Sequence, residues 1–299
     1  MSVPGYRKAA RFGAWLLSAI LLVCFWQWYT RKFEVSPAIF PSPLEVWKSL
    51  WANLTDGTFL KDLVVTLREV MIGFLGGSFV GFFLALVISE FRPVRTIVYP
   101  YVIGLQSVPK TALAPMFLIW FGFGIESKVA LVVSTVFFPV LINTLSGIER
   151  TDPDQLEMLR AYCGRRWRVF LRVKLPSALP ALFAGLELAI VLAIIAAVVS
   201  EFLGAVGGLG YRILTYNTDL DMAGEFAALA VLSLTGFVLH GIVRLVGQRL
   251  VFWGHHPDGD PDCLHEAPNR FARAAFSKES RIKFANAKKL DRKSGARGA

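Results

Sequence analysis

The chain has little charge and few side chains of the kinds that catalyse reactions or bind metals. Only 18% of its 299 residues are Asp, Glu, Lys or Arg, whereas a soluble domain carries about 25%. Its three cysteines, at positions 24, 163 and 263, lie in separate segments, and it has only four histidines. This spacing excludes a disulfide framework and paired metal ligands. The scarcity of histidine also argues against a membrane enzyme with a clustered active site.

A phosphate-binding loop is also missing. No G-x-x-x-x-G-K-[ST] stretch occurs anywhere, so the chain does not hold ATP phosphates in that manner. His255, His256, Cys263 and His265 lie close together in the sequence, but their spacing fits no zinc-ligand pattern. We therefore expect no catalytic residue, no cofactor and no metal site, and we do not expect the chain to be an enzyme.

Apolar residues are abundant instead, and they occur in long runs. They make up 55% of the chain, and the mean hydropathy is +0.52. A helix needs about 20 such residues to cross about 30 Å of hydrocarbon, and a helix is required because lipid offers unpaired backbone groups no partner. The segments that meet this condition are about 12–30, 66–89, 97–121, 128–148, 177–200 and 226–250. The predicted fold class is an all-α polytopic membrane protein with six transmembrane helices.

The distribution of Lys and Arg predicts the orientation of these helices, because basic residues concentrate in cytoplasmic connections. With the N-terminus inside, and the C-terminal tail left out, the inner connections hold 12 Lys and Arg residues and the outer ones hold 6. Arg31 and Lys32 follow the first apolar run without a small-residue cleavage site, so this run is predicted to be a retained anchor. Both termini are then cytoplasmic. The net charge of +10 reflects topology, and we expect no nucleic-acid partner.

The cytoplasmic connection between the fourth and fifth apolar segments is expected to form a helical hairpin. Asp152 followed by Pro153 is a helix-start pattern, and Gly164 can end that first helix. A second helical stretch, RRWRVFLRVK at 165–174, leads into the next apolar run. A basic amphipathic hairpin at a membrane surface either lies on anionic headgroups or docks to an acidic partner. The residues alone leave both possibilities open.

This connection resembles the coupling loop of ATP-binding-cassette importer permeases. The family pattern is Glu-Ala-Ala, three residues, Gly, nine residues, Ile, one residue and Leu-Pro. Glu157 stands at the glutamate position, and Val173, Leu175 and Pro176 fall at the matching distances. The resemblance implies that the loop docks in a groove of a cytoplasmic ATPase.

Two departures from the family pattern are visible. Met158 and Leu159 replace the alanine pair, and Cys163 stands at the glycine position with Gly164 one residue later, so the turn is expected to be shifted. The residues that the resemblance assigns to ATPase coupling are Glu157, Leu159, Cys163, Gly164, Trp167, Val173, Leu175 and Pro176.

Four more stretches are similar to one branch of this family, the permeases for nitrate, sulfonate, taurine and similar small solutes. They are FPSPLEVW (40–47), VPKTALAPMFLIWFGFG (108–124), residues 166–189 and VVSEFLGAVGGLGYRI (198–213). The resulting division has an N-terminal segment with the first transmembrane helix at 1–35, a permease core at 36–252 with the coupling loop at 152–176, and a basic, disordered cytoplasmic tail at 253–299.

The resemblance implies a permease subunit of an ATP-driven importer for a small, anionic solute, working by alternating access in a bacterial inner membrane. The implied partners are cytoplasmic ATP-binding-cassette ATPase subunits, a periplasmic or extracellular solute-binding protein, a second permease copy in a homodimer, and membrane lipid. The alternative is a secondary transporter or channel without an ATPase partner. Such proteins normally show inverted repeats, and no convincing repeat is present.

Three residues are candidates for the solute pathway: Pro109, Lys110 and Glu201. Lys110 lies about 13 residues into its apolar segment, which at about 1.5 Å per residue is near mid-membrane. A charge there either contacts an anionic solute, or pairs with Glu187 or extends toward the membrane surface. Both interpretations remain open. Pro109 and Pro115 are expected to kink or break this segment.

Glycines mark two further features. Gly73, Gly77 and Gly81 have GxxxG spacing, which favours close helix packing over pore lining. Glu201 begins a glycine-rich stretch that is predicted to be a flexible external loop. Within it, Tyr211 and Arg212 either face the solute-binding protein or pack within the loop itself.

Overall fold

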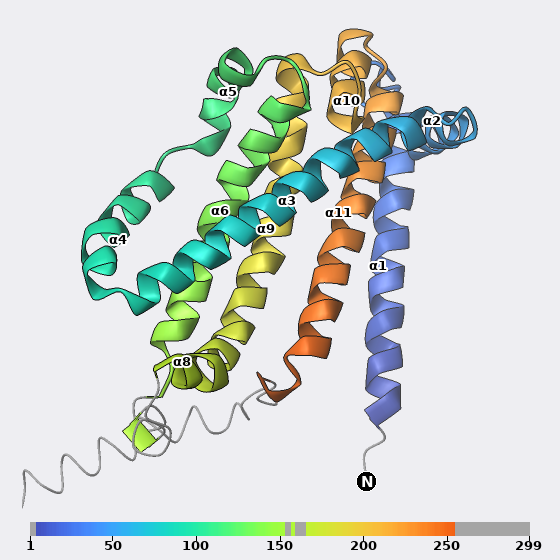
Figure 1. The fold of residues 1–299 in the computed structure, drawn as a ribbon. Coiled ribbons are helices and arrows are strands. Elements are labelled where there is room, and N and C mark those ends of the chain that lie inside the picture. Colours follow the sequence, from blue (N-terminus) through green and yellow to red (C-terminus); the bar gives the residue numbers. More distant parts are fainter. Residues whose placement is uncertain (1–3, 153–156, 159–165, 255–299) are drawn as a thin grey trace, which may run out of the picture. The chain divides into compact units, whose positions relative to one another are not determined.

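The structure, a computed structural model, describes residues 4–152, 157–158 and 166–254. These residues form helices and connecting turns and contain no strand (Figure 1). The elements are α1 (Pro4–Lys32), α2 (Pro43–Thr55), α3 (Thr58–Glu90), α4 (Arg92–Gln106), the 3-10 turn η1 (Lys110–Leu113), α5 (Ala114–Phe121), α6 (Ile125–Glu149), α8 (Arg166–Val169), the π-helical η2 (Phe170–Lys174), α9 (Leu175–Gly204), α10 (Leu209–Thr218) and α11 (Met222–Leu250). A second unit begins at Val251, and its described part holds the 3-10 turn η3 (Phe252–Gly254).

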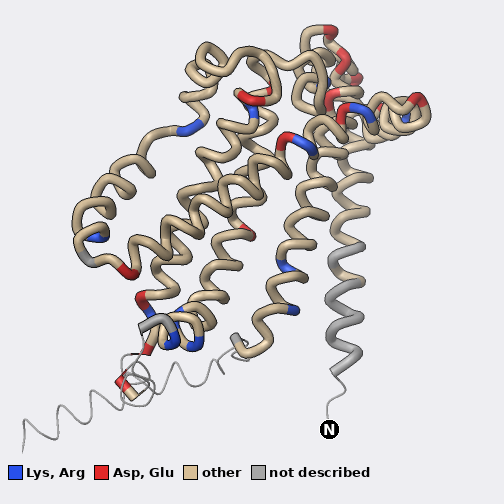
Figure 2. The backbone as a smooth tube through the Cα atoms, viewed as in Figure 1, with Lys and Arg blue, Asp and Glu red and all other residues tan. Residues whose placement is uncertain are grey.

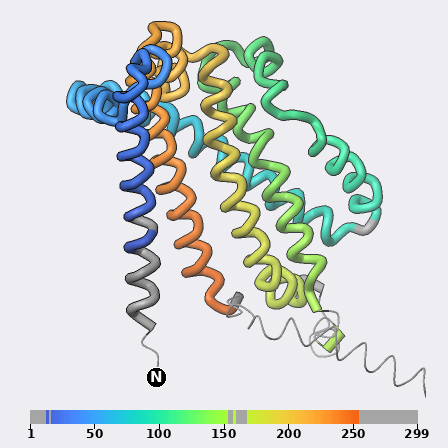
Figure 3. The backbone as a smooth tube through the Cα atoms, turned by 180° about the vertical axis from the view of Figure 1, so that it is seen from behind, coloured from blue at the N-terminus to red at the C-terminus, as the bar shows by residue number. Residues whose placement is uncertain are grey.

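Helices α3, α6 and α9 form the centre of the first unit. Their shared core consists of aliphatic side chains such as Val70, Leu131, Val136 and Ile190, all 1% exposed or less. Seen from the front and from behind, α1 stands next to α11, and α4 lies on the far side of the central helices (Figure 1 and Figure 3). Most Lys, Arg, Asp and Glu residues lie toward the two ends of the long helices (Figure 2). We call these ends the α8 end, where α1 also begins, and the α10 end, where α1 finishes.

The glycine stripe of α3 packs directly against α6, as the GxxxG spacing predicts. A Cβ atom added at Gly77 would come within 2.9 Å of the Val133 carbonyl oxygen, and one at Gly81 within 2.6 Å of the Phe137 carbonyl oxygen. These distances leave no room for a side chain. The glycines therefore allow the two backbones to approach closely, which is how helices gain van der Waals contact when no water drives them together.

The predicted segment 97–121 is broken rather than continuous. Its two halves, Pro93–Gln106 and Lys110–Phe121, are bent by 84°. Pro109 adopts an extended conformation before η1, and Pro115 lies in the first turn of α5. Proline lacks a backbone N–H and disfavours helical conformation in the residue before it, so the break falls where the sequence predicted it.

The other five predicted segments are continuous helices, although their ends differ from the prediction. Among the described residues, four helical stretches are long and apolar enough to cross a membrane: Thr58–Glu90, Ile125–Glu149, Phe170–Gly204 and Met222–Leu250. The bent pair adds a fifth if it counts as one span. The prediction of six spans is therefore not confirmed in number, and it requires α1 to cross the membrane as well.

The glycine contacts give a first testable prediction. Gly81→Ala should lower the midpoint of thermal unfolding in detergent, because overpacking a tight contact typically costs about 1–3 kcal/mol. Gly76→Ala is the matched control, since its nearest neighbour, Val133 Cγ2, is 3.5 Å from the added Cβ. Alanine also favours a helix over glycine by about 1 kcal/mol. The control should be neutral or stabilising, and equal effects at both positions would contradict the close-packing account.

Candidate functional site

A buried polar cluster lies where α3, α6, α9 and α10 meet, at the α10 end. We define this polar cluster as Asp62, Thr66, Glu69, Lys128 and Glu201, all of which are buried. Burial of charge among apolar helices is costly and is maintained only where partners compensate it. Each member of the cluster has such a partner.

Helix α3 supplies three members of the cluster from one face. Asp62, Thr66 and Glu69 are spaced at i, i+4 and i+7, so they line up along the helix, and the glycine stripe continues the same line from Gly73. The face of α3 that contacts its neighbours is thus polar in its first turns and nearly flat beyond them.

The cluster caps the N-terminus of α10. Asp62 Oδ1 accepts the Gly208 N–H at 3.2 Å, and Thr66 Oγ1 accepts the Leu209 N–H at 2.9 Å. Glu201 Oε2 accepts the Gly210 N–H at 2.5 Å, while Thr66 donates its hydroxyl to Glu201 Oε1 at 2.6 Å. The first N–H groups of a helix have no partner within the helix and favour negative charge. Side chains from α3 and α9 therefore satisfy the start of α10.

Two glycines make this approach possible. A Cβ atom at Gly208 would lie 2.2 Å from Glu201 Oε1, and one at Gly210 would lie 2.6 Å from Glu201 Oε2. Gly208 also has a φ of +111°, a conformation that other residues rarely adopt. The glycine-rich stretch after Glu201 thus brings a backbone close to a buried carboxylate.

A buried ion pair completes the cluster. Lys128 Nζ lies 3.1 Å from Glu69 Oε1, with the two side chains 7% and 1% exposed. The second oxygen of Glu69 is buried, and no donor in the described part of the chain bonds to it. Lys128 is one of the six Lys and Arg residues counted in the outer connections, but it lies in the first turn of α6 and its ammonium group faces α3. The pair therefore joins α3 to α6.

The segment predicted as a flexible external loop is largely helical. After a turn at 205–208, α10 runs from Leu209 to Thr218. Arg212 does not stand free to face a partner, because its Nε donates to Asp62 Oδ2 at 2.7 Å. Tyr216 donates its hydroxyl to Asn53 of α2 at 2.6 Å, and burial raises the pKa of this phenol. These contacts join α10 to α3 and α2, and the prediction of a loop was wrong from Leu209 onward, where the chain is helical.

Lys110 lies at the break between α4 and α5. Its ammonium group donates to the Gln106 carbonyl and lies 4.8 Å from the ring centroid of Phe138. Phe138 is near the middle of α6, so Lys110 lies beside the middle of that helix. The contacts to Gln106 and Phe138 replace the pairing with Glu187 that the sequence allowed.

At the α8 end, the arginine-rich stretch is helical from Arg166 and continues into α9 without a break. Five residues, Phe170–Lys174, form a π-helical turn in which the Leu175 N–H is directed to the Phe170 carbonyl. Pro176 then lies in the first turn of α9. Pro176 has no backbone N–H. The change from α-helical to π-helical bonding therefore costs no hydrogen bond donated by that residue. The second helix of the predicted hairpin is therefore an extension of the fifth apolar helix.

Contacts hold this extension against the other helices. Val169, Phe170 and Val173 are buried, and Lys174 pairs with Glu90 at the end of α3. Leu175 begins α9 and is half-buried, and Glu157 is exposed. Leu159, Cys163 and Gly164 lie outside the described residues, as does the predicted disordered tail from 255 onward.

Sequence reasoning missed most of the polar cluster. It singled out Glu201, but not Asp62, Thr66, Glu69 or the pairing of Lys128. The available signal was Glu69 itself, because an ionisable residue inside a long apolar run indicates a buried partner. In the described ranges no group of three or more His, Cys, Asp and Glu residues could hold a metal ion.

The long apolar helices are those of an integral membrane protein. Residues 77–252 match the family described as "Binding-protein-dependent transport system inner membrane component", and the chain belongs to this family.

Three curated relatives, each named as a transport permease protein, agree with this assignment. The chain is 33% identical to the formylaminopyrimidine transport permease protein ThiX of Halalkalibacterium halodurans, over 78% of this chain and 93% of that one. It is 27% identical to the putative aliphatic sulfonates transport permease protein SsuC of Bacillus subtilis, over 86% and 92%. It is also 27% identical to the taurine transport system permease protein TauC of Escherichia coli, over 79% and 87%.

Solved structures show the same fold at low sequence identity. A crystal structure of an amino acid ABC transporter with histidines aligns with a TM-score of 0.54 at 18% identity, covering 68% of this chain and 96% of that one. An inward-facing form of the MetNI methionine ABC transporter aligns at 0.53 and 17% identity, covering 62% and 91%. The helical fold is thus that of ABC transporter permeases.

The buried ion pair gives a second prediction. Lys128→Met should destabilise the protein by about 3–5 kcal/mol, because it leaves the Glu69 carboxylate buried without its cation. The double variant Lys128→Met/Glu69→Met should be more stable than Lys128→Met alone, since it removes both charges. Thermal unfolding in detergent measures both. If the double variant lost the sum of the two single effects, the residues would not be coupled.

Proposed function

We propose that this chain is the transmembrane permease subunit of an ATP-driven importer that moves a small solute by alternating access. The observation that supports the proposal is the helical extension at the α8 end, which contains part of the predicted coupling loop and is continuous with α9. Family membership supports a transport role and disfavours the alternative of a secondary transporter or channel without an ATPase partner.

The contacts of the extension suggest how coupling operates. Because α8, η2 and α9 form one helical stretch, a displacement of Arg166–Lys174 by a docked ATPase is applied directly to α9. The Lys174–Glu90 pair links the same stretch to α3. At this end Arg95 of α4 also pairs with Glu149 of α6, with 2.7 Å between Nη2 and Oε1. A displacement of the extension would act on α9 and α3 directly, and the Arg95–Glu149 pair holds α4 and α6 together at the same end. This arrangement suits a rigid-body transition between two packings.

The polar cluster lies at the α10 end, opposite the proposed ATPase-docking end. Buried hydrogen bonds fix α10 to α3 and α9, and the Lys128–Glu69 pair links α3 to α6. We propose that this end is extracytoplasmic and receives the solute-binding protein, and that both termini are cytoplasmic. Because the polar cluster joins α10 to these helices, binding of that protein at α10 would shift the equilibrium between the same two packings that the ATPase acts on from the other side.

The solute is proposed to be small and anionic. ThiX, SsuC and TauC are named for a formylaminopyrimidine, sulfonates and taurine, two of which are sulfonate classes. Lys110 offers a half-buried ammonium group at a broken helix, with the preceding Pro109 removing one backbone donor. We propose that Lys110 contacts the solute anion in a pathway completed by a second permease copy. Glu201 is proposed to support that pathway by fixing α10, since its carboxylate is already bonded to Thr66 and Gly210.

The coupling role gives a third prediction. Glu157→Lys should leave the amount of permease in the membrane unchanged and reduce the ATPase that co-purifies with it. Glu157 is exposed, so reversing its charge disturbs a partner rather than the core. Truncating a desolvated charged contact costs about 2–5 kcal/mol, and each 1.4 kcal/mol is a tenfold change in affinity. Association should therefore weaken more than tenfold, and uptake should be lost.

Asp219→Lys is the matched control for this experiment. Asp219 is an exposed carboxylate at the C-terminus of α10, at the opposite end of the helices. Its charge reversal should leave ATPase association intact. If Glu157→Lys behaved like Asp219→Lys in the co-purification, the coupling assignment would be wrong.

The solute proposal gives a fourth prediction. Lys110→Gln should slow uptake of an anionic solute in cells that express the whole transporter, while stimulation of the ATPase by the loaded binding protein persists. Taurine, an alkanesulfonate and nitrate are the probes, and the uncharged formylaminopyrimidine serves as a comparison. Lys61→Gln is the control, because Lys61 is an exposed lysine in the first turn of α3. Normal uptake of every anion by Lys110→Gln would refute the contact.

A further inference from the structure

Helix α2 has two apolar faces, and only one of them is covered. Val46, Leu50 and Leu54 pack against a small core that includes Phe59 and Leu209. The adjoining face carries Leu44, Trp47 and Trp51, which are 46%, 61% and 62% exposed. These three residues lie at i, i+3 and i+7, so they form one stripe along the helix.

The stripe cannot turn inward, because α2 is held in place at both ends. Ser42 and Glu45 form a capping box at its N-terminus, and Trp26 of α1 donates its indole N–H to the Pro41 carbonyl at 3.1 Å. At the other end Asn53 accepts the hydroxyl of Tyr216. The exposure of the two indoles is therefore fixed by the fold rather than by a chance rotamer.

The position of α2 identifies what it meets. It follows the end of α1 and precedes α3, and it packs against α1, α3 and α11. It lies on the opposite side of the central helices from α4 in both views (Figure 1 and Figure 3). It therefore lies beside the ends of three long apolar helices, α1, α3 and α11.

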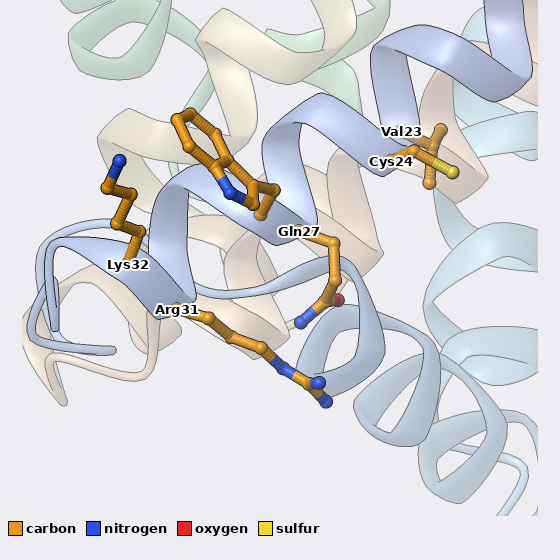
Figure 4. A pocket seen from close by; sticks show the side chains of 6 residues that line it. Val23, Cys24, Gln27, Arg31 and Lys32 are labelled. Carbon is orange, nitrogen blue, oxygen red and sulfur yellow. The ribbon is translucent and has the colours of Figure 1, made fainter.

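The adjacent end of α1 has the chemistry of the same boundary. An open groove of about 600 Å³ on its surface is lined by Val23, Cys24, Gln27, Trp28, Arg31 and Lys32. Figure 4 shows that the groove passes from Val23 and Cys24 to the two basic side chains. Lys32 Nζ lies 4.7 Å from the ring centroid of Trp28. The apolar side chains of this groove would contact lipid acyl chains, and its basic side chains, Arg31 and Lys32, would contact lipid phosphates.

We propose that α2 is an interfacial helix whose stripe of Leu44, Trp47 and Trp51 is embedded in the phospholipid headgroup layer at the α10 end. The indoles bury their rings toward the acyl chains and direct their N–H groups to the headgroups, as aromatic residues at membrane boundaries do. Lys48 lies on the same face and is exposed, so its ammonium group meets lipid phosphate. The lipid surface on α2 is continuous with the groove of α1.

Spin-label accessibility in the full chain tests the proposal. Cys24, Cys163 and Cys263 are first replaced by serine, and the protein is placed in nanodiscs of phosphatidylethanolamine and phosphatidylglycerol. A nitroxide is then attached to Trp47→Cys or Trp51→Cys, with Val46→Cys and Leu50→Cys as matched controls, because these two half-buried residues pack against the small core. Oxygen partitions into lipid, whereas a water-soluble nickel chelate does not.

Labels at 47 and 51 should collide with oxygen several-fold more often than with the nickel chelate, and those at 46 and 50 should be shielded from both. Nickel collisions in excess at 47 and 51 would place the stripe in water and overturn the proposal. Shielding from both reagents there would overturn it as well, because it would show that a second copy or another protein covers the stripe. The result does not depend on the proposed importer function.

Discussion

The close approach of α3 to α6 is the constraint on which the rest of the fold depends. A single line of residues on α3 first presents Asp62, Thr66 and Glu69 and then the glycines. Because the glycines remove the side-chain layer between the helices, Glu69 comes within 3.1 Å of Lys128. The same proximity keeps water out, which makes each polar contact stronger and each unpaired group more costly. The ion pair between α3 and α6 therefore depends on the close packing of the same two helices.

The polar cluster also explains why the glycine-rich stretch after Glu201 is ordered. Loops rich in glycine lose much conformational entropy when they become fixed. Here three successive N–H groups, at Gly208, Leu209 and Gly210, each find an acceptor from another helix. The cost of ordering is offset by satisfying the start of α10, and glycine is what allows the carboxylate to come so near. A stretch whose glycines predicted a flexible loop is thus held by hydrogen bonds to neighbouring helices.

Local patterns predicted the features that depend on local physics. Apolar runs located the helices, Pro109 and Pro115 located the break, and the spacing of Gly73, Gly77 and Gly81 predicted close helix packing. The pairing of Lys128 with Glu69 was not predicted, because a count of basic residues in connections treats each one as solvated. Nor was α10, because its stability comes from acceptors more than 140 residues earlier in the chain. Long-range pairing has no signature in a short window of sequence.

The π-helical turn at Phe170–Lys174 has a consequence for how sequences of this kind can vary in length. Such a turn holds one residue more than the α-helix on either side of it. Removing one residue there converts the turn to ordinary α-helix and leaves the buried faces of α8 and α9 in register. A deletion anywhere else in α9 would rotate one face by about 100° relative to the other, since an α-helix has 3.6 residues per turn. The turn is thus the one place in this stretch of described helix where a change in length is absorbed without repacking.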